Sequence, residues 1–447
     1  MKFNASKYSN YITLFYCISF FLVINGGLFS FLTKGTPFTI WRQILTFIGF
    51  SLVIGLDEGA SCFDAFYYAF GRYKNRSLIK IEKDLLLLTF LCIPYCIYAF
   101  FFQGYGLIRV GFALWMYTAG FHVVLFSSYL LNSSKYNPRS IFKFFSLLGL
   151  FLSIGLIIDS QTLLFKFLVL SAHEDISYLA EEDLAMNRCS FLAESVSTFG
   201  VYFSFCVLSS FYLLYHSSKT KSQFFYLLCS FLPLIGSWFT GSRQIFVIVL
   251  LMFFAGFVYY VICAKGNRVI LLVIFSIILI ASGSVITSLL SSNEYLLERY
   301  LGDDKSTSKA DDTRIRQWKN GIDYMQENKL VLLIGHGVGS VPIKGVREGE
   351  FIGSNYENTF LAKMVDVGLF GIVLVLFPVI KIFSLLRKYK KKSIFDYLIL
   401  VLLFNYLFVA FVSPNGATLS TQYIMFLVLS IYIHREKFEL ENKYASC

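Results

Sequence analysis

Long, almost uncharged apolar segments recur along this chain, and they limit its fold more than any other feature of the sequence. The hydrocarbon core of a bilayer is about 30 Å thick, and an α-helix of roughly 20 residues crosses it. Backbone groups cannot stay unpaired in lipid, so only helices or closed barrels span a membrane. Barrel strands would be short and alternating, whereas these segments are long and uniformly apolar in a chain that is 56% hydrophobic and 15% charged. The sequence therefore predicts an all-α polytopic integral membrane protein.

The apolar segments divide the chain into about twelve transmembrane helices within a single membrane domain, 1–447. We expect these helices at 10–32, 40–56, 84–103, 107–131, 141–158, 196–215, 223–240, 244–263, 269–290, 358–381, 394–413 and 417–434. The first of them is too long for a cleavable signal peptide and lacks a small-residue cleavage site, so we interpret it as a retained span.

Basic residues are concentrated in every second connection between these helices. The connections near 104–106 and 413–416 carry none, whereas 387–392 carries five. Because loops rich in Lys and Arg stay in the cytoplasm, both termini are predicted to be cytoplasmic. The net charge of +11 then faces anionic lipid headgroups, and no nucleic-acid partner is expected.

The same topology places two large connections outside the cytoplasm: a smaller loop at 159–195 and a larger one at 291–355, between the ninth and tenth spans. The larger loop is predicted to be flexible at 303–312, where acidic residues mix with serine and lysine. A helix is expected over 314–328, because its apolar residues are spaced 3, 4 and 3 apart. These residues are Ile315, Trp318, Ile322 and Met325.

The run Gly335-x-Gly337-x-Gly339 follows this predicted helix. It lacks the strand and helix context of a nucleotide-binding loop. We expect a tight turn that brings backbone N–H groups toward the membrane surface, with Gly337 as a candidate substrate contact.

Arg243 ends a short outward turn and is a candidate contact for an anion. The turn reads Thr240-Gly241-Ser242-Arg243, and glycine there would let the backbone approach a ligand closely. A guanidinium presents a planar fork of donors that suits phosphate better than lysine does. The alternative is an interfacial anchor whose charged end snorkels to water. Arg109, near the outer end of its span, is a secondary candidate for anion binding.

Arg314 and Arg316 are further candidates, because a helix would present Arg314 and Trp318 from one side. Their alternative role is ordinary ion pairing with the adjacent Asp311 and Asp312.

Glu357 and Asn358 stand where the larger loop re-enters the membrane. On a helix over 358–381, Glu357 shares a stripe with Met364, Gly368 and Gly371, within about 40° at 100° per residue. Glycines on a stripe permit another helix to pack closely, so Glu357 would face protein rather than lipid. Such a carboxylate is either paired with arginine or poised as a base.

The remaining polar residues of the spans give no sign of a cofactor. Asp366 lies on the face opposite Glu357, with Lys363 as its expected partner. Cys92 and Cys96 are one helical turn apart but no histidine motif accompanies them. We therefore expect neither a metal ion nor another cofactor.

Taken in order, these motifs resemble the O-antigen ligase / Wzy-type superfamily, which includes polymerases of O antigen and capsular polysaccharide. The resemblance is carried by the turn ending at Arg243, Arg314-x-x-x-Trp318, the Gly-x-Gly run, and Glu357-Asn358-x9-Gly368-x-x-Gly371. It covers roughly the C-terminal half in motifs and the whole chain in topology. Ligases of this superfamily usually have histidine where this chain has Glu357, so the resemblance favours a polymerase.

The resemblance implies a metal-independent, membrane-embedded glycosyltransferase of GT-C-like fold in the bacterial cell (inner) membrane. It would transfer glycan repeat units from undecaprenyl diphosphate to a lipid-linked acceptor, with the lipid bilayer and a chain-length regulator as further partners. In this scheme the catalytic residues are Arg243 and Arg314, which stabilise the leaving diphosphate, and Glu357, the base. The substrate-binding residues would be Arg316, Trp318, Gly337, Asn358 and Arg109, with Arg316 the less essential arginine of its pair.

Two alternatives stay open. A ligase of the same superfamily would transfer finished polymer to a lipid acceptor. A lipid-linked oligosaccharide flippase is the alternative of another class, because twelve spans are common among carriers. Carriers usually contain repeated halves and polar residues at mid-bilayer, whereas the candidates here cluster on the outer side.

Overall fold

The computed structural model describes most of the chain from residue 80 onward, together with Ile18 and Phe21. The described ranges are 80–132, 139–162, 189, 191–193, 196–263, 305–327, 329–340, 358–388, 393–413 and 419–435. Within these ranges every regular element is helical and none is a strand. The spans predicted at 10–32 (Ile18 and Phe21 apart), 40–56 and 269–290 lie outside them, as does most of the loop at 159–195.

Six helices of the described part are long and apolar enough to cross a membrane. They are α5 (Lys80–Phe101), α7 (Arg139–Thr162), α11 (Thr220–Phe239), α12 (Arg243–Cys263), α18 (Leu369–Lys388) and α19 (Ile394–Val412). Further apolar helices are α6 (Leu107–Asn132), α10 (Phe199–Tyr215) and α20 (Leu419–Ile433). Each overlaps a predicted span, so the chain is a multi-pass α-helical membrane protein.

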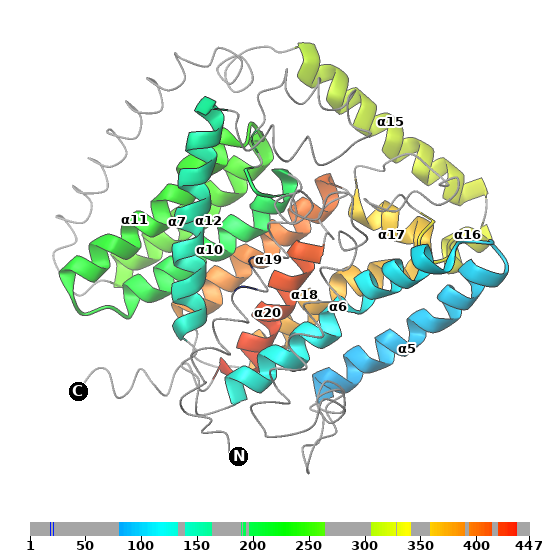
Figure 1. Ribbon diagram of the computed structural model, residues 1–447, viewed down its shortest axis with the longest axis horizontal. Coiled ribbons are helices and arrows are strands. Elements are labelled where there is room, and N and C mark those ends of the chain that lie inside the picture. Colours follow the sequence, from blue (N-terminus) through cyan, green and yellow to red (C-terminus); the bar gives the residue numbers. More distant parts are fainter. Residues whose placement is uncertain are drawn as a thin grey trace.

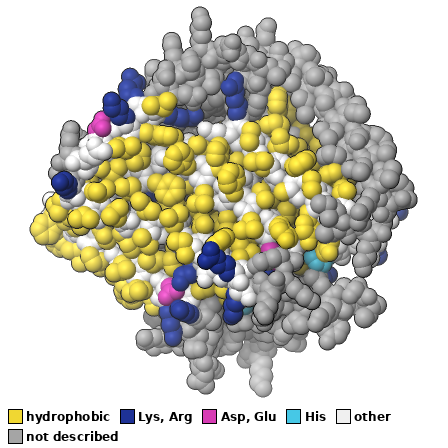
Figure 2. Space-filling view, turned by 180° about the vertical axis from the view of Figure 1, so that it is seen from behind, with side chains coloured by type: hydrophobic (Ala, Val, Ile, Leu, Met, Phe, Trp, Pro, Cys, Tyr) yellow, Lys and Arg dark blue, Asp and Glu magenta, His cyan; other side chains and the backbone are white. Residues whose placement is uncertain are grey.

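The surface of the bundle has the character expected of a lipid-facing wall. Figure 2 shows a broad field of hydrophobic side chains, with lysine and arginine confined to its edges. Leu87, Phe90 and Phe254 are each 58% exposed. In water a patch of this kind would mark an interaction site, but in a bilayer the hydrocarbon chains cover it.

Helix α10 forms the centre of one part of the bundle, between α7, α11, α12 and α19 (Figure 1). All of its residues are buried except the last, Tyr215. Its serines donate to carbonyls one turn earlier, as in the bond from Ser204 Oγ to Gly200 O of 2.8 Å. Asn405 Nδ2 donates to both Ser204 Oγ and Ile248 O at 2.9 Å, and these bonds join α10, α12 and α19. Polar contacts of this kind hold helices together where no hydrophobic effect operates between them.

Helices α12 and α19 run antiparallel. Asn405 of α19 bonds to Ile248 near the start of α12, whereas Tyr397 packs on Tyr259 near its end, with ring centroids 5.5 Å apart. The start of α12 and the end of α19 therefore share one end of the bundle. We name it the Arg243 end, and the opposite one, where α18 finishes, the Lys388 end.

Helices α5 and α6 form a hairpin beside α18 and α20, on the side away from α10 (Figure 1). Lys381 Nζ of α18 lies 2.5 Å from Asp84 Oδ2 of α5. Between α6 and α20 the helices approach closely, because Gly120 faces the ring of Phe426.

The predicted helix over 358–381 is broken, which is a correction. The structure has α17 (Thr359–Val367), then Gly368, then α18. Gly368 has φ +64° and ψ −151°, which an L-residue with a side chain rarely adopts. The predicted stripe that joined Glu357 and Met364 to Gly368 and Gly371 on one continuous helix is therefore wrong. The sequence is apolar on both sides of the break at Gly368, so hydrophobicity alone does not reveal the break.

The break allows two backbone segments to cross in direct contact. Helix α16 (Lys329–Ile334) ends beside the end of α17. A Cβ on Gly368 would lie 2.2 Å from the carbonyl oxygen of Leu333, and one on Gly335 would lie 2.4 Å from that of Asp366. We call this contact the glycine crossing. The expectation that another helix packs closely on these glycines holds for Gly368, which meets the end of α16 at Leu333, whereas Gly371 meets Lys363 of α17 itself.

Helix α15 (Lys305–Glu327) begins earlier than predicted. The composition of 303–312 predicts a flexible segment, but the structure is helical from Lys305. Between 305 and 320 the sequence contains no glycine or proline, so nothing interrupts propagation of the helix. The apolar stripe is also narrower than predicted: Met325 is 4% exposed, but Ile315 and Ile322 are 62% and 44% exposed.

The glycine crossing predicts a large difference between two alanine substitutions. Gly104→Ala, at φ +67° with nothing within 4 Å of the new Cβ, should cost only the backbone strain of about 1–2 kcal/mol. Gly368→Ala adds a steric overlap with Leu333 and should unfold the protein at a clearly lower temperature. Thermal unfolding of both variants in detergent, monitored by size-exclusion chromatography, measures the difference between their unfolding temperatures. Equal shifts would contradict the crossing.

Candidate functional site

The first residues of α17 are fixed at the Arg243 end. Thr359 Oγ1 donates to the carbonyl of Ser413, the residue after α19, at 2.7 Å. Asn358 is the N-cap of α17, and its Oδ1 accepts from Leu361 N at 3.1 Å. Glu357 lies outside the described residues, but the residue that follows it is thus held in place. Asn358 therefore has a structural role that its assignment to substrate binding did not include.

Trp318 anchors α15 at the same end of the bundle, the Arg243 end. Its ring packs edge-on against Phe411 in the last turn of α19, with centroids 5.1 Å apart. It also joins a small core with Met325, Leu361 and Val365. This core connects α15 to the side of α17.

The two arginines of α15 occupy different faces. Arg314, one turn before Trp318, is half-buried like the tryptophan, whereas Arg316 is exposed. The prediction that a helix presents Arg314 and Trp318 from one side is consistent with this pattern. Arg314 is thus the arginine on the face that α15 turns toward the bundle.

Arg243 is the first residue of α12, and its side chain is exposed. The turn before it is tight: Gly241 has φ +65° and donates its N–H to Trp238 O at 3.1 Å. Trp238 packs edge-on against Phe246, with centroids 5.0 Å apart. The turn that the sequence predicted is therefore present, and it positions Arg243 at the same end of the bundle as Trp318 and Asn358.

The run of three glycines forms a turn, but its N–H groups point elsewhere than expected. All three have positive φ, and His336 N and Gly337 N donate to Val365 O and Asp366 O at 2.8 and 2.9 Å. The last carbonyls of a helix lack partners within the helix, and this turn supplies them for α17. The expectation that these N–H groups face the membrane surface is therefore wrong for residues 336 and 337. A Cβ on Gly337 would lie 2.8 Å from Ala99 Cβ, so this glycine also permits close packing on α5.

Arg109 holds the same turn from the side of α6. Its side chain is 1% exposed, and Nε donates to Gly339 O at 2.6 Å. Nη2 lies 3.4 Å from Ser340 O, and the guanidinium lies 4.1 Å from the ring centre of Tyr105. These contacts are internal to the protein, and the assignment of Arg109 to anion binding stays a prediction.

Asp366 is the polar centre of this region, and its partners differ from the one that the sequence predicted. Its carboxylate accepts from Tyr117 Oη and Ser340 Oγ, both at 2.7 Å. The expected partner, Lys363, instead places its ammonium 4.0 Å from the ring centre of Tyr117. Only the presence of a carboxylate inside an apolar segment signalled that partners exist. Tyr117 is 249 residues away in sequence, so the sequence could not identify it.

His336 lies beside this carboxylate in the turn. Burial lowers the pKa of His336, and the charge of Asp366 opposes the shift. Because the pKa falls below its ordinary value of 6.5, the imidazole is mostly neutral at pH 7.

The cap at Asn358 predicts a separation of stability from activity. Asn358→Ala should destabilise the protein by about 1 kcal/mol, because α17 loses its cap. Asn358→Asp keeps the acceptor and should restore the melting temperature, but it removes the amide N–H groups and should lower the activity of the protein, if Asn358 binds substrate as the sequence predicts. If Asn358→Asp is as active as the wild type, the role of this residue is limited to capping.

Residues 200–376 match the family model described as O-antigen ligase. The match begins in α10 and ends in α18, and it includes Arg243, Arg314, Trp318, Gly337 and Asn358, together with Glu357. Arg109 precedes it. No curated protein matches the chain. Through residues 200–376 the chain therefore carries a domain of the O-antigen ligase / Wzy-type superfamily, as its motifs predicted.

Proposed function

We propose that the protein is a polysaccharide polymerase on the outer face of the bacterial cell membrane. It would transfer glycan repeat units from undecaprenyl diphosphate to a lipid-linked acceptor repeat unit. The observation that supports this proposal is that Arg243, Trp318 and Asn358 lie at one end of the bundle. Arg314 is close to Trp318 in sequence, and Glu357 directly precedes Asn358. Two guanidinium groups and a carboxylate could therefore act on one substrate there.

The residue types fit the chemistry of glycosyl transfer. The bond between the anomeric carbon and the diphosphate oxygen breaks, and negative charge develops on the leaving diphosphate. Arg243 and Arg314 would stabilise that charge, with Arg316 the less essential arginine of its pair, and fixed donors do this best where water is excluded. Glu357 would take the proton from the acceptor hydroxyl, whose oxygen forms the new bond to the anomeric carbon.

The packing of α15 supports a fixed position for one arginine. Because Trp318 is held between Phe411 and the core beside α17, the helix cannot rotate freely about its axis. Arg314, one turn earlier, keeps a constant position as a result. Preorganisation of this kind matters because a misplaced charge loses most of its effect on the transition state.

A ligase is the second candidate function, because the matching family model is that of an O-antigen ligase. The glycans of a deletion strain distinguish the candidates. Loss of a polymerase leaves single repeat units on outward-facing lipid carrier, whereas loss of a ligase leaves long polymer on the carrier. Loss of a flippase would leave single units facing the cytoplasm, and that result would overturn the proposal.

We predict that Arg243→Lys lowers polymer formation by about 10²–10³-fold, because an ammonium cannot reproduce the bidentate contact with the diphosphate. The measurement is the ladder of polymer lengths from a strain that expresses only the variant. Arg387→Lys is the matched control, since this exposed arginine lies in the last turn of α18 at the Lys388 end. A normal ladder from Arg243→Lys would remove the role in phosphate binding.

Glu357→Gln tests the base separately. We expect a loss of about 10²–10⁴-fold at neutral pH, the usual contribution of one general base. The rate of glycan transfer by purified full-length protein measures it, with Glu350→Gln as a control that removes a carboxylate from the same loop. Full activity of Glu357→Gln would show that the carboxylate is structural.

A further inference from the structure

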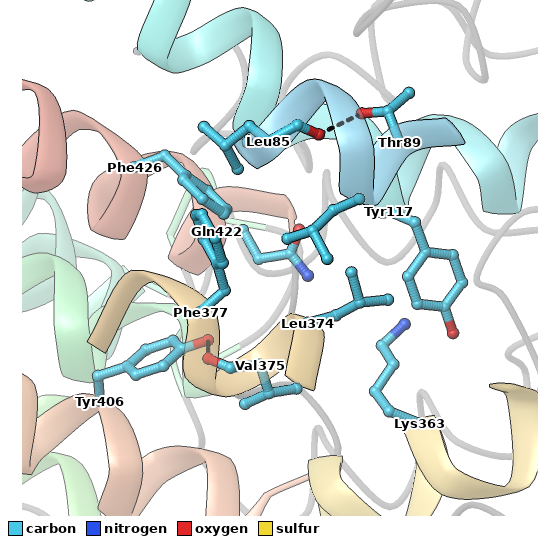
Figure 3. A pocket seen from close by; sticks show the side chains of 12 residues that line it. Leu85, Thr89, Tyr117, Lys363, Leu374, Val375, Phe377, Tyr406, Gln422 and Phe426 are labelled. Carbon is cyan, nitrogen blue, oxygen red and sulfur yellow. Dashed lines mark hydrogen bonds between the residues drawn. The ribbon is translucent and has the colours of Figure 1, made fainter. Parts of the chain in front are cut away.

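The turn at 335–340 lies inside the helical bundle, level with its membrane-spanning helices. A Cβ on Gly339 would lie 3.5 Å from Ala113 Cβ of α6. Ala113 is six residues beyond the start of α6, which is about 9 Å along the helix axis. Val338 is fully buried and shares a small core with Ala113 and Leu374, and Leu374 also lines a small cavity inside the bundle (Figure 3). The turn therefore lies below the tip of the α5–α6 hairpin.

Exposed apolar side chains extend beyond this depth, to the tip of the hairpin. Phe101 and Phe102, where α5 ends, are 72% and 77% exposed. Leu107 and Ile108, where α6 begins, are 71% and 59% exposed. In a chain that spans a bilayer, an apolar surface of this kind marks contact with lipid. The hydrocarbon region therefore reaches the hairpin tip, and the turn lies within it.

The polar groups of the turn are paired within the protein, as this depth requires. Backbone that is not helical is tolerated in the hydrocarbon region only where it is buried in protein or lines a water-filled cavity. The three glycines of the turn are buried. His336 N and Gly337 N donate to the last carbonyls of α17, and Arg109 Nε donates to Gly339 O. The turn is thus built like a segment that lies below the membrane surface.

Helix α16 leads to this turn and has one exposed apolar face. Leu330 and Leu333, one turn apart on the same side, are 63% and 58% exposed, whereas Val331 is buried. A Cβ on Gly368 would lie 2.2 Å from Leu333 O. The next residue, Leu369, begins α18 and is 44% exposed. The exposed face of α16 is therefore continuous with the lipid-facing wall of the bundle.

The chain approaches and leaves this region at the same end of the bundle. Before α16, Trp318 of α15 packs against Phe411 at the Arg243 end. After the turn, Thr359 is bonded to Ser413 at that same end. The segment between them therefore does not cross the membrane.

We propose that α16 and the turn at 335–340 form a re-entrant segment, which enters the leaflet at the Arg243 end and returns without crossing the bilayer. Leu330 and Leu333 contact the acyl chains of that leaflet. Lys329 is exposed at the start of α16 and lies among the phosphate groups of the headgroups, because the long stem of lysine lets its charge reach the interface. This part of the large loop is thus a lipid-binding surface.

The re-entrant segment also limits the height of α15 above the membrane. A single residue separates the end of α15 from the start of α16, and Trp318 attaches α15 to α19. With both attachments, α15 stays close to the headgroups. Arg314 is then held near the level at which the diphosphate of a lipid-linked substrate lies. This consequence rests on the proposed function, whereas the lipid contact of α16 does not.

Photo-crosslinking to lipid tests the segment and needs no turnover. Full-length protein with p-benzoylphenylalanine in place of Leu330 or Leu333 is irradiated in phosphatidylcholine nanodiscs, and the mass of the intact protein reveals any lipid adduct. We expect both positions to form lipid adducts as Phe90 does, a residue 58% exposed on α5. The same probe in place of Asn320, exposed on the side of α15 opposite Trp318, should form none.

The other outcomes decide against one proposal or the other. Lipid adducts at Phe90 but at neither position of α16 would overturn the re-entrant segment. Adducts with a second copy of the chain in place of lipid would overturn it as well, because α16 would then face protein. Leu330 and Leu333 report separately, so if one variant does not fold the other decides. Absence of polymer from a chain that gives these lipid adducts would contradict the proposed function and leave the re-entrant segment intact.

Discussion

The glycine crossing is the contact on which the arrangement of the functional region depends. Two backbone segments meet without intervening side chains at Gly335 and Gly368, and the N–H groups of the turn satisfy the last carbonyls of α17. Helix α17 is thereby held at its end by the turn, while at its start Thr359 is bonded to Ser413. A helix of nine residues is too short to be stable by itself in water, so these two attachments determine where it lies.

The attachments of α17 also determine where several groups of the proposed site lie. Its N-cap Asn358 follows Glu357, its side supports α15 through the core around Trp318, and Lys363 projects from it toward the ring of Tyr117 (Figure 3). Asp366 joins this helix to α6 through Tyr117 and to the turn through Ser340. Since each group is placed by the same short helix, a reaction between two lipid-linked substrates would have a common frame.

In the part of the chain that the structure describes, hydrophobic segments predicted most of the apolar helices, because lipid imposes a length and a composition that can be read locally. The turn before Arg243 and the helix that carries Arg314 and Trp318 were also predictable from local patterns. These patterns are a glycine between two spans and the spacing of apolar residues. The break at Gly368 was not predictable, since the residues on both sides of it are apolar and its cause is a contact with Leu333. Tyr117 lies 249 residues from Asp366, and Gly339 lies 230 residues from Arg109, so these partners could not be predicted either. Ile315 is exposed although its spacing fits a buried stripe. Sequence patterns indicate the local structure of each segment, whereas the break at Gly368 and the partners of Asp366 and Arg109 depend on contacts between distant segments.

Helix α10 has a consequence for how the protein is made. It is surrounded by other helices in the folded bundle, yet it precedes α11, α12 and α19 in the chain and must enter the membrane before they exist. Its serines Ser204, Ser209 and Ser210 each have an acceptor within their own helix. The hydroxyl groups can therefore be paired within α10 when it first meets lipid, and the bonds between Asn405 and Ser204 and between Ser146 and Ser210 form as the helices assemble. A helix that is polar enough to be recognised by later neighbours can in this way still be inserted alone.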